Sequence, residues 1–134
     1  MLNQPLIWDA KFEIGVEEID QQHRFFLSLI NRLSIELERN DNQKYLLALF
    51  SELNAYARFH FISEENIMLR AAYPNLEEHR RQHLELVEQL HAKEWKLRSR
   101  SSAEEGGHIV AFLVQWFLVH TSQEDKQFAD FLLS

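Results

Sequence analysis

Five histidines and two carboxylates are spaced so that their side chains would meet in the interior of a helical protein. These residues are His23, His60, Glu64, His79, His83, His120 and Asp125. An α-helix makes one turn in about 3.6 residues, so two side chains four positions apart project from the same face. One such pair is common on amphipathic helices and indicates little by itself. The combination of such spacings on several segments predicts a metal site.

These polar residues interrupt stripes of apolar residues, which predicts that they are buried. A single histidine in a core, such as His23, usually makes one hydrogen bond and has a structural role. A buried carboxylate such as Glu64 differs, because an unpaired ionised acid is costly to remove from water. A metal cluster satisfies all of these groups, since neutral imidazoles donate lone pairs and carboxylates balance positive charge.

The number and type of these ligands predict two metal ions rather than one. Seven ligands exceed a tetrahedral zinc site and are too rich in imidazole for calcium or magnesium. The chain has no cysteine, which excludes disulfides, thiolate zinc sites, iron–sulfur clusters and cysteine-ligated haem. Two octahedral irons offer about 12 positions, of which five histidines, two bridging carboxylates and a bridging oxide or hydroxide fill about 11. The open position would suit a small ligand such as dioxygen.

Apolar residues recur every three or four positions in four segments, which predicts four amphipathic helices. The segments are 19–37, 46–67, 76–90 and 109–120. Only three Gly and two Pro occur in 134 residues, so many short strands and tight turns are not expected. The expected fold is all-α, an up-down-up-down four-helix bundle with an N-terminal arm that contains Trp8 and Phe12. The whole chain, 1–134, is expected to be one domain.

Two helix boundaries follow from local residue types. Pro74 would end the second helix, because proline forces its neighbour into extended geometry. Ser102 and Glu105 form a candidate capping box for the fourth helix. Gly106 and Gly107 cost about 1 kcal/mol each inside a helix, so this helix could instead begin after them. We assign no function to these two glycines.

The spacing of Asp125 predicts a break in the last helix. Asp125 lies five residues after His120, which on a continuous α-helix would place it about 140° around the axis. We therefore expect a helix end or a turn within 121–124. A short C-terminal helix would follow and pack back on the bundle through Phe128, Phe131 and Leu132.

Charge and hydropathy exclude other classes of partner. The formal net charge of -7 offers no basic surface for nucleic acid or an anionic membrane. No secretion signal is recognisable after Met1, and no stretch approaches the roughly 20 apolar residues of a membrane span. These observations predict a soluble, cytoplasmic protein.

The motifs resemble those of the hemerythrins, most closely the single-domain bacteriohemerythrins. Residues 60–65 (H-F-I-S-E-E) match the pattern H-F-x-x-E-E, residues 79–83 match HxxxH, and residues 120–125 match HxxxxD. Residues 19–23 (I-D-Q-Q-H) resemble the first-helix motif, and Tyr73-Pro74 resembles the turn before the third helix. The resemblance covers nearly the whole chain and includes every proposed ligand.

The resemblance implies a non-haem di-iron centre that binds dioxygen reversibly. One iron would be held by His79, His83 and His120. The second iron would be held by His23 and His60, and would carry the open position. Glu64 and Asp125 would bridge the two. Di-iron oxygenases and ferritins use more carboxylates, so the histidine-rich set favours oxygen binding over oxygen activation and predicts that the chain is not an enzyme.

Neighbours of the ligands are expected to form the oxygen pocket. Phe26, Phe61 and Trp116 each lie within one helical turn of a ligand and would keep the pocket dry. Thr121 stands where hemerythrins commonly carry Ile, and its hydroxyl would either bond the bound ligand or admit water and speed autoxidation.

Four other titratable residues are expected to be bystanders. His91 and His108 lie about 80° and 120° around their helices from the nearest ligand, so we expect them at the surface. Glu65 and Glu78 neighbour ligands, but a solvated helix face is the favoured interpretation for both, rather than a hydrogen bond to an imidazole.

Three physiological uses remain open from the sequence. The first is an oxygen carrier or store that supplies a client oxidase. The second is an oxygen- or redox-sensing domain that controls an output domain of a larger signalling protein. The third is an enzyme that acts on peroxide or nitric oxide. The sequence favours reversible oxygen binding as the molecular activity.

Overall fold

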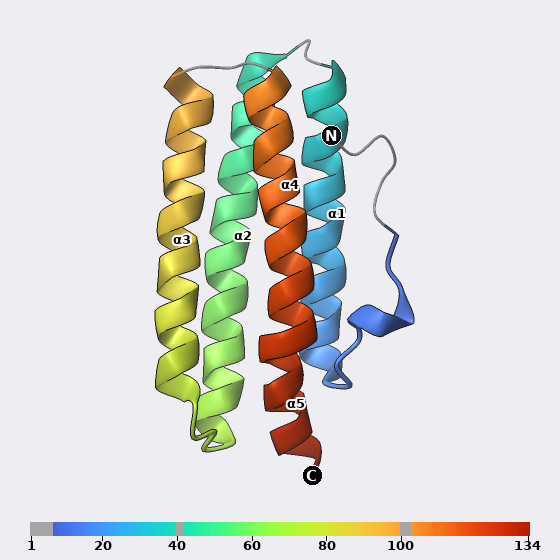
Figure 1. Ribbon diagram of the computed structural model, residues 1–134, viewed down its shortest axis with the longest axis vertical. Helices are drawn as coiled ribbons and strands as arrows, with labels where there is room; N and C mark the ends of the chain where they lie inside the picture. Colours follow the sequence, from blue (N-terminus) through green and yellow to red (C-terminus); the bar gives the residue numbers. More distant parts are fainter. Residues whose placement is uncertain (1–6, 40–41, 100–102) are drawn as a thin grey trace.

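Four long helices pack side by side in a computed structural model that describes residues 7–39, 42–99 and 103–134, with backbone alone at 103–107 and 121–122. They are α1 (Glu17–Arg39), α2 (Gln43–Arg70), α3 (Leu76–Ser99) and α4 (Ala103–Val119). The helices alternate in direction, and each packs against two neighbours to close a ring (Figure 1). Within the described ranges there is no strand, and the predicted all-α, up-down-up-down bundle is confirmed.

The N-terminal arm is tied to the start of α1 by one buried carboxylate. Asp20 Oδ1 accepts a hydrogen bond from the backbone N of Ile14 (2.9 Å), and Asp20 Oδ2 accepts one from Gly15 (3.1 Å). Gly15 has a φ of +92°, a conformation that other residues rarely adopt. The arm also contains the single turn η1 (Ala10–Phe12), and the buried Phe12 packs against Phe117 of α4 with ring centroids 5.8 Å apart. The arm therefore covers one seam of the bundle.

The turn between α2 and α3 has a Schellman geometry. Ala72 is left-handed, with φ of +56°, and its N–H donates to the carbonyl of Leu69 (3.1 Å). The next N–H, of Tyr73, donates to the carbonyl of Met68 (3.0 Å). The second helix therefore ends before Pro74, as predicted, but at Arg70, where the turn begins, rather than next to the proline.

The start of α4 differs from one of the sequence-based alternatives. Its backbone is helical from Ala103, before Gly106 and Gly107, so the expectation that the helix begins after the two glycines is wrong. Packing of the buried Ile109 and Leu113 outweighs the low helix propensity of the glycines. The predicted capping residue Ser102 lies outside the described residues.

The break expected after His120 is a change of helix type. Residues His120–Asp125 form a π-helical stretch, η2, and α5 (Lys126–Leu133) continues in line with α4 (Figure 1). The prediction of a helix end or turn is wrong, because i→i+5 hydrogen bonding accommodates the extra residue without ending the helix. Phe128 is buried as expected, whereas Phe131 and Leu132 are 41% and 38% exposed.

Two hydrophobic clusters lie on either side of the polar residues along the bundle axis. The large core cluster runs through all four long helices and includes Phe26, Phe50, Leu53, Leu97 and Phe117. The small core cluster joins the starts of α1 and α3 to the end of α2 and to α5. Its buried members are Ile14, Ile19, Met68, Tyr73, Leu76, Phe128 and Ala129. The polar interior is thus closed by apolar side chains at both ends.

Candidate metal centre

All seven sequence-predicted ligands meet in the interior between the two clusters. His23 comes from α1, His60 and Glu64 from α2, His79 and His83 from α3, and His120 and Asp125 from η2. Each of these residues is 4% exposed or less. The helical spacings therefore position the side chains as the sequence indicated. The π-helical stretch brings His120 and Asp125, five residues apart, to within 2.9 Å of each other (Nε2 to Oδ1).

The carboxylate of Glu64 faces two different groups of histidines with its two oxygens. Oε1 lies 3.3 Å from Nε2 of His83 and 3.7 Å from Nε2 of His120. Oε2 lies 3.5 Å from Nε2 of His60 and 3.9 Å from Nε2 of His23. One carboxylate is therefore shared between a three-histidine group (His79, His83 and His120) and a two-histidine group (His23 and His60).

Asp125 repeats this division from the other side of the centre. Its Oδ1 lies 2.9 Å from Nε2 of His120 and 3.8 Å from Nε2 of His79. Its Oδ2 lies 2.9 Å from Nε2 of His23. Both carboxylates thus direct one oxygen to each histidine group, which is the arrangement that two bridged metal ions require.

Several buried polar atoms of the centre make no hydrogen bond within the protein. Among the described residues, both oxygens of Glu64, both oxygens of Asp125 and Nε2 of His79 are buried without a hydrogen bond. Leaving buried acceptors unsatisfied is costly. The residues fit a cation, because carboxylate oxygens and imidazole nitrogens are ligands for transition metals. Two sets of these atoms are close enough to share an ion: one from His23, His60, Glu64 and Asp125, and the other from Glu64, His83 and His120.

Gln22 orients His60 and was not recognised from the sequence. His60 Nδ1 donates a hydrogen bond to Gln22 Oε1 (2.7 Å), which leaves Nε2 free to face the centre. Gln22 is itself held, because its Nε2 donates to Ser63 Oγ (2.9 Å) and its carbonyl accepts from Tyr56 (3.2 Å). The available signal was its place in the I-D-Q-Q-H motif beside His23.

Glu65 orients His83 in the same way, which corrects the sequence interpretation of this residue. His83 Nδ1 donates to Glu65 Oε2 (2.7 Å), and Arg80 Nε lies 3.6 Å from the other oxygen of Glu65. Glu65 faces α3 rather than solvent, and only 18% of its side chain is exposed. Glu78, by contrast, is 52% exposed and pairs with Arg81, so its predicted solvated position is confirmed.

The two histidine groups differ in the electrostatics of the metal-free protein. Burial lowers the pKa of His60 to about 4, although the nearby Glu64 opposes this. Burial also acts to lower the pKa of His120, but the negative charge of Asp125, 2.9 Å away, together with Glu64 at 3.7 Å, raises it to about 10. The pKa of His83 is likewise raised, because the effect of burial is outweighed by the carboxylate of Glu64, 3.3 Å away, and by the hydrogen bond to Glu65.

The bridging carboxylates stay ionised despite complete burial. Burial raises the pKa of Asp125, but the charge of His120, 2.9 Å away, with the nearby imidazoles of His23 and His79, holds it well below its usual range. The pKa of Glu64 is lowered in the same sense, because its histidine neighbours outweigh burial and the charge of Asp125. The centre therefore holds two ionised carboxylates that can balance the charge of a bound cation.

Aromatic side chains surround the imidazoles. Phe26 meets the ring of His60 edge-on at 6.4 Å, Phe61 stacks on His83 at 4.2 Å, and Trp116 stacks on His120 at 5.4 Å. Phe117, missed from the sequence, meets His23 edge-on at 5.7 Å. It lies three residues before His120, so helical spacing could have identified it. The side chain of Thr121 lies outside the described residues, and its role stays a prediction.

His91 and His108 are exposed and away from the centre, as predicted. No helix among the described residues is long and apolar enough to cross a membrane.

The fold and the site define a helical bundle with a buried histidine–carboxylate centre suited to cations. Comparison with known proteins agrees: residues 14–132 match the hemerythrin HHE cation binding domain. The chain belongs to the hemerythrin family.

Relatives that are similar along their length include proteins named bacteriohemerythrin. The one from Clostridium acetobutylicum is 28% identical over 131 residues, which cover 92% of this chain and 98% of the relative. The one from Stenotrophomonas maltophilia is 27% identical, over 93% of this chain and 80% of the relative. A hemerythrin-like protein of Naegleria gruberi is 24% identical, over 92% and 91%.

Proposed function

We propose that this protein binds dioxygen reversibly at a non-haem di-iron centre and acts as an oxygen carrier or store. The observation that carries the proposal is the division of each buried carboxylate between the two histidine groups. Two ions would use all four oxygens, because each carboxylate directs one oxygen to each histidine group. Membership of the hemerythrin family supports the choice of iron and dioxygen.

Each side chain has a definite role in this proposal. His79, His83 and His120 hold one iron, His23 and His60 hold the other, and Glu64 and Asp125 bridge them. When bound, the iron pair supplies the electrons that dioxygen takes up on binding and regains them on release. The two-histidine group has fewer protein ligands, so dioxygen binds on that side.

The surrounding residues favour release of intact dioxygen. Phe26 is fully buried and Phe117 is 1% exposed, and both lie against the two-histidine group. These rings keep water from the ligand and slow the escape of reduced oxygen species. Gln22 and Glu65 hold their imidazoles in the tautomer that faces the centre.

The test is iron content together with the visible absorption of the anaerobically reduced protein before and after exposure to air. We expect about two irons per chain and a visible band that forms with oxygen and disappears when oxygen is removed. Iron that oxidises at once without a reversible band would contradict oxygen carriage and favour a redox or oxygen sensor. Catalytic turnover of peroxide or nitric oxide would favour an enzyme, and a chain that binds no iron would refute the proposal.

A further inference from the structure

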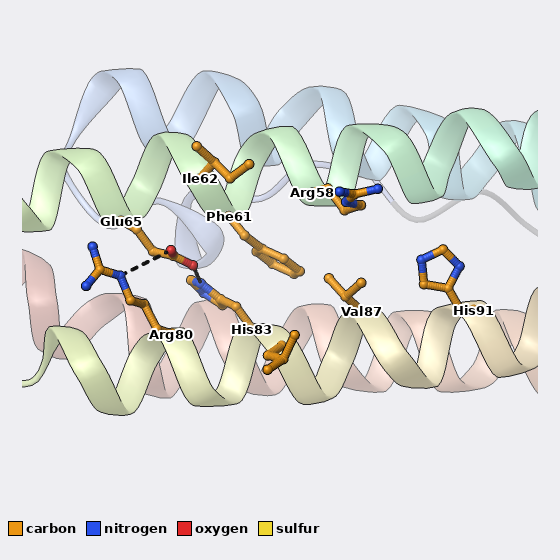
Figure 2. Close-up of a pocket in the computed structure, with 9 residues that line it drawn as sticks. Arg58, Phe61, Ile62, Glu65, Arg80, His83, Val87 and His91 are labelled. Atoms are coloured by element: carbon orange, nitrogen blue, oxygen red, sulfur yellow. Dashed lines mark hydrogen bonds and ion pairs between the residues drawn. The ribbon is translucent and has the colours of Figure 1, made fainter.

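An open groove runs between α2 and α3 on the outer side of the three-histidine group. It has a volume of about 500 Å³. Phe61 and Val87 lie along its apolar part, and Ile62 and Leu84 are beside them, 57% and 60% exposed (Figure 2). Exposed apolar side chains around a groove of this size are typical of a surface that takes an apolar ligand.

One end of the groove carries an unpaired cation. Arg58 of α2 and His91 of α3 face each other there (Figure 2). Arg58 has no ion pair or hydrogen bond among the described residues, although the chain has a net charge of -7. Most other described arginines are paired with carboxylates: Arg24, Arg32, Arg39, Arg80, Arg81 and Arg98. Arg58 is therefore free to bind an anion from solution.

At the opposite end of the groove the cation is already paired with carboxylates. Arg80 lies there, with Nε 3.6 Å from Glu65 and Nη1 2.5 Å from Glu77. Arg58 and Glu65 are seven residues apart on α2, which corresponds to about 10 Å along the helix. A ligand that fits this distribution has one anionic end, at Arg58, and an apolar body that extends toward Phe61 and Leu84.

We propose that the groove binds an amphiphilic organic monocarboxylate, with its carboxylate on Arg58 and its apolar body over Phe61, Val87 and Leu84. The planar guanidinium of arginine matches a carboxylate with two parallel hydrogen bonds. His91 provides a further polar group at the same end. Burial of the apolar body supplies the remaining affinity, as in other small-molecule sites.

The groove is in direct contact with a ligand of the candidate metal centre. The ring of Phe61 stacks on His83 with a centroid distance of 4.2 Å and an interplanar angle of 9°. Glu65, also in the groove, accepts the hydrogen bond from His83. A ligand body over Phe61 therefore lies against the ring that stacks on His83. The effect of the ligand on bound iron rests on the proposed function, whereas binding of the ligand to the groove does not.

The first experiment is calorimetric titration of the purified protein with octanoate. Arg58→Leu is compared with Arg70→Leu, which removes an arginine from the same helix that also lacks an ion pair among the described residues. We expect Arg58→Leu to weaken binding about tenfold or more, because a charge-assisted pair is lost. Arg70→Leu should change it less than about twofold. Equal weakening by both variants, or none by either, would overturn the proposal.

Two further titrations test the apolar part and the headgroup. The double variant Ile62→Ser/Leu84→Ser replaces two side chains that are exposed, and it should weaken octanoate binding about tenfold. 1-Octanol, which has the same chain without the charge, should bind at least about tenfold more weakly than octanoate. Absence of octanoate binding to the unmodified protein at millimolar concentration, or equal binding of 1-octanol, would refute an anionic ligand.

A spectroscopic measurement tests the contact with the centre. With iron bound, octanoate should shift the visible absorption of the unmodified protein and of Arg70→Leu, but not that of Arg58→Leu at the same concentration. An unchanged spectrum at saturating octanoate would refute the coupling to His83. A chain that binds octanoate but no iron would keep the groove proposal and refute the proposed function.

Discussion

The two histidine groups of the centre are built from the same ligand type but have different supports. His60 is oriented by the neutral amide of Gln22, whereas His83 is oriented by the carboxylate of Glu65. The pKa of His60 is lowered to about 4, mainly by burial, and that of His83 is raised. An anionic hydrogen-bond partner makes an imidazole more basic, so that it donates its lone pair to a metal more strongly. The three-histidine group should therefore bind its metal more tightly. The two groups therefore differ in the charge of the residue that orients an imidazole.

Removing the carboxylate of Glu64, which faces both histidine groups, should have the largest effect. Glu64→Ala takes one oxygen from each group, so binding of both metals should weaken and iron should fall from about two to under about one per chain. The thermal stability gained from bound metal should fall with it, by about 4 kcal/mol or more at saturating iron. Elemental analysis and calorimetric unfolding measure both. Glu88→Ala, on the exposed face of α3, is the control; retention of two irons by Glu64→Ala would contradict the bridging role.

Removing one histidine from the weaker group should separate the two metals. His60→Ala leaves His23 as the last imidazole of its group, so we expect about one iron per chain, held by the three-histidine group. His83→Ala should lower the free energy of unfolding more than His60→Ala does. It leaves the charged Glu65 without its imidazole, whereas His60→Ala leaves the neutral Gln22 without one. Iron content and unfolding temperature distinguish these results. Identical losses in the two variants would mean that the groups are not independent.

The number of protons released on metal binding should also differ between the two histidine groups. His120, with a pKa of about 10 in the metal-free protein, is protonated at pH 7, so metal must displace this proton. Metal affinity of the three-histidine group should therefore rise by about tenfold per pH unit between pH 6 and 8. His60, with a pKa of about 4, is already neutral there. Anaerobic titration of His60→Ala with ferrous iron in weak buffer should release at least about one proton per metal, and flat affinity would contradict this.

Changing the charge of Gln22 or Glu65, the residues that orient His60 and His83, should have the smallest effect. Glu65→Gln should weaken metal binding by the three-histidine group about tenfold, and Gln22→Glu should strengthen binding by the two-histidine group by a similar factor. Competition with a chelator of known affinity measures both. Glu78→Gln, which removes an exposed charge from α3 that contacts no imidazole in the described structure, should have no effect. Equal responses of the three variants would assign the change to overall charge.

The helices and the seven converging residues could be predicted because both depend on local periodicity. Stripes of apolar residues at three- and four-residue spacing fix which face of each helix is buried, and the histidines lie on those faces. Gln22 and Glu65 could not be assigned, because their roles depend on which neighbouring helix each one faces. The geometry after His120 was harder still. The spacing excluded an ordinary α-helix, but it did not distinguish a turn from a π-helical stretch.

The π-helical stretch also has a consequence for insertions and deletions in this chain. A π turn accommodates one more residue than an α turn while the helix on either side keeps its direction. Deleting the exposed Gln123 would therefore restore an ordinary helix, with the aspartate four residues after His120 and Phe128 still facing inward. Compared with a four-residue spacing, the five-residue spacing contains one inserted residue, which the bundle accommodates beside the candidate metal centre. Sequence alignments of such bundles should therefore allow a one-residue gap at this point without assuming a different fold.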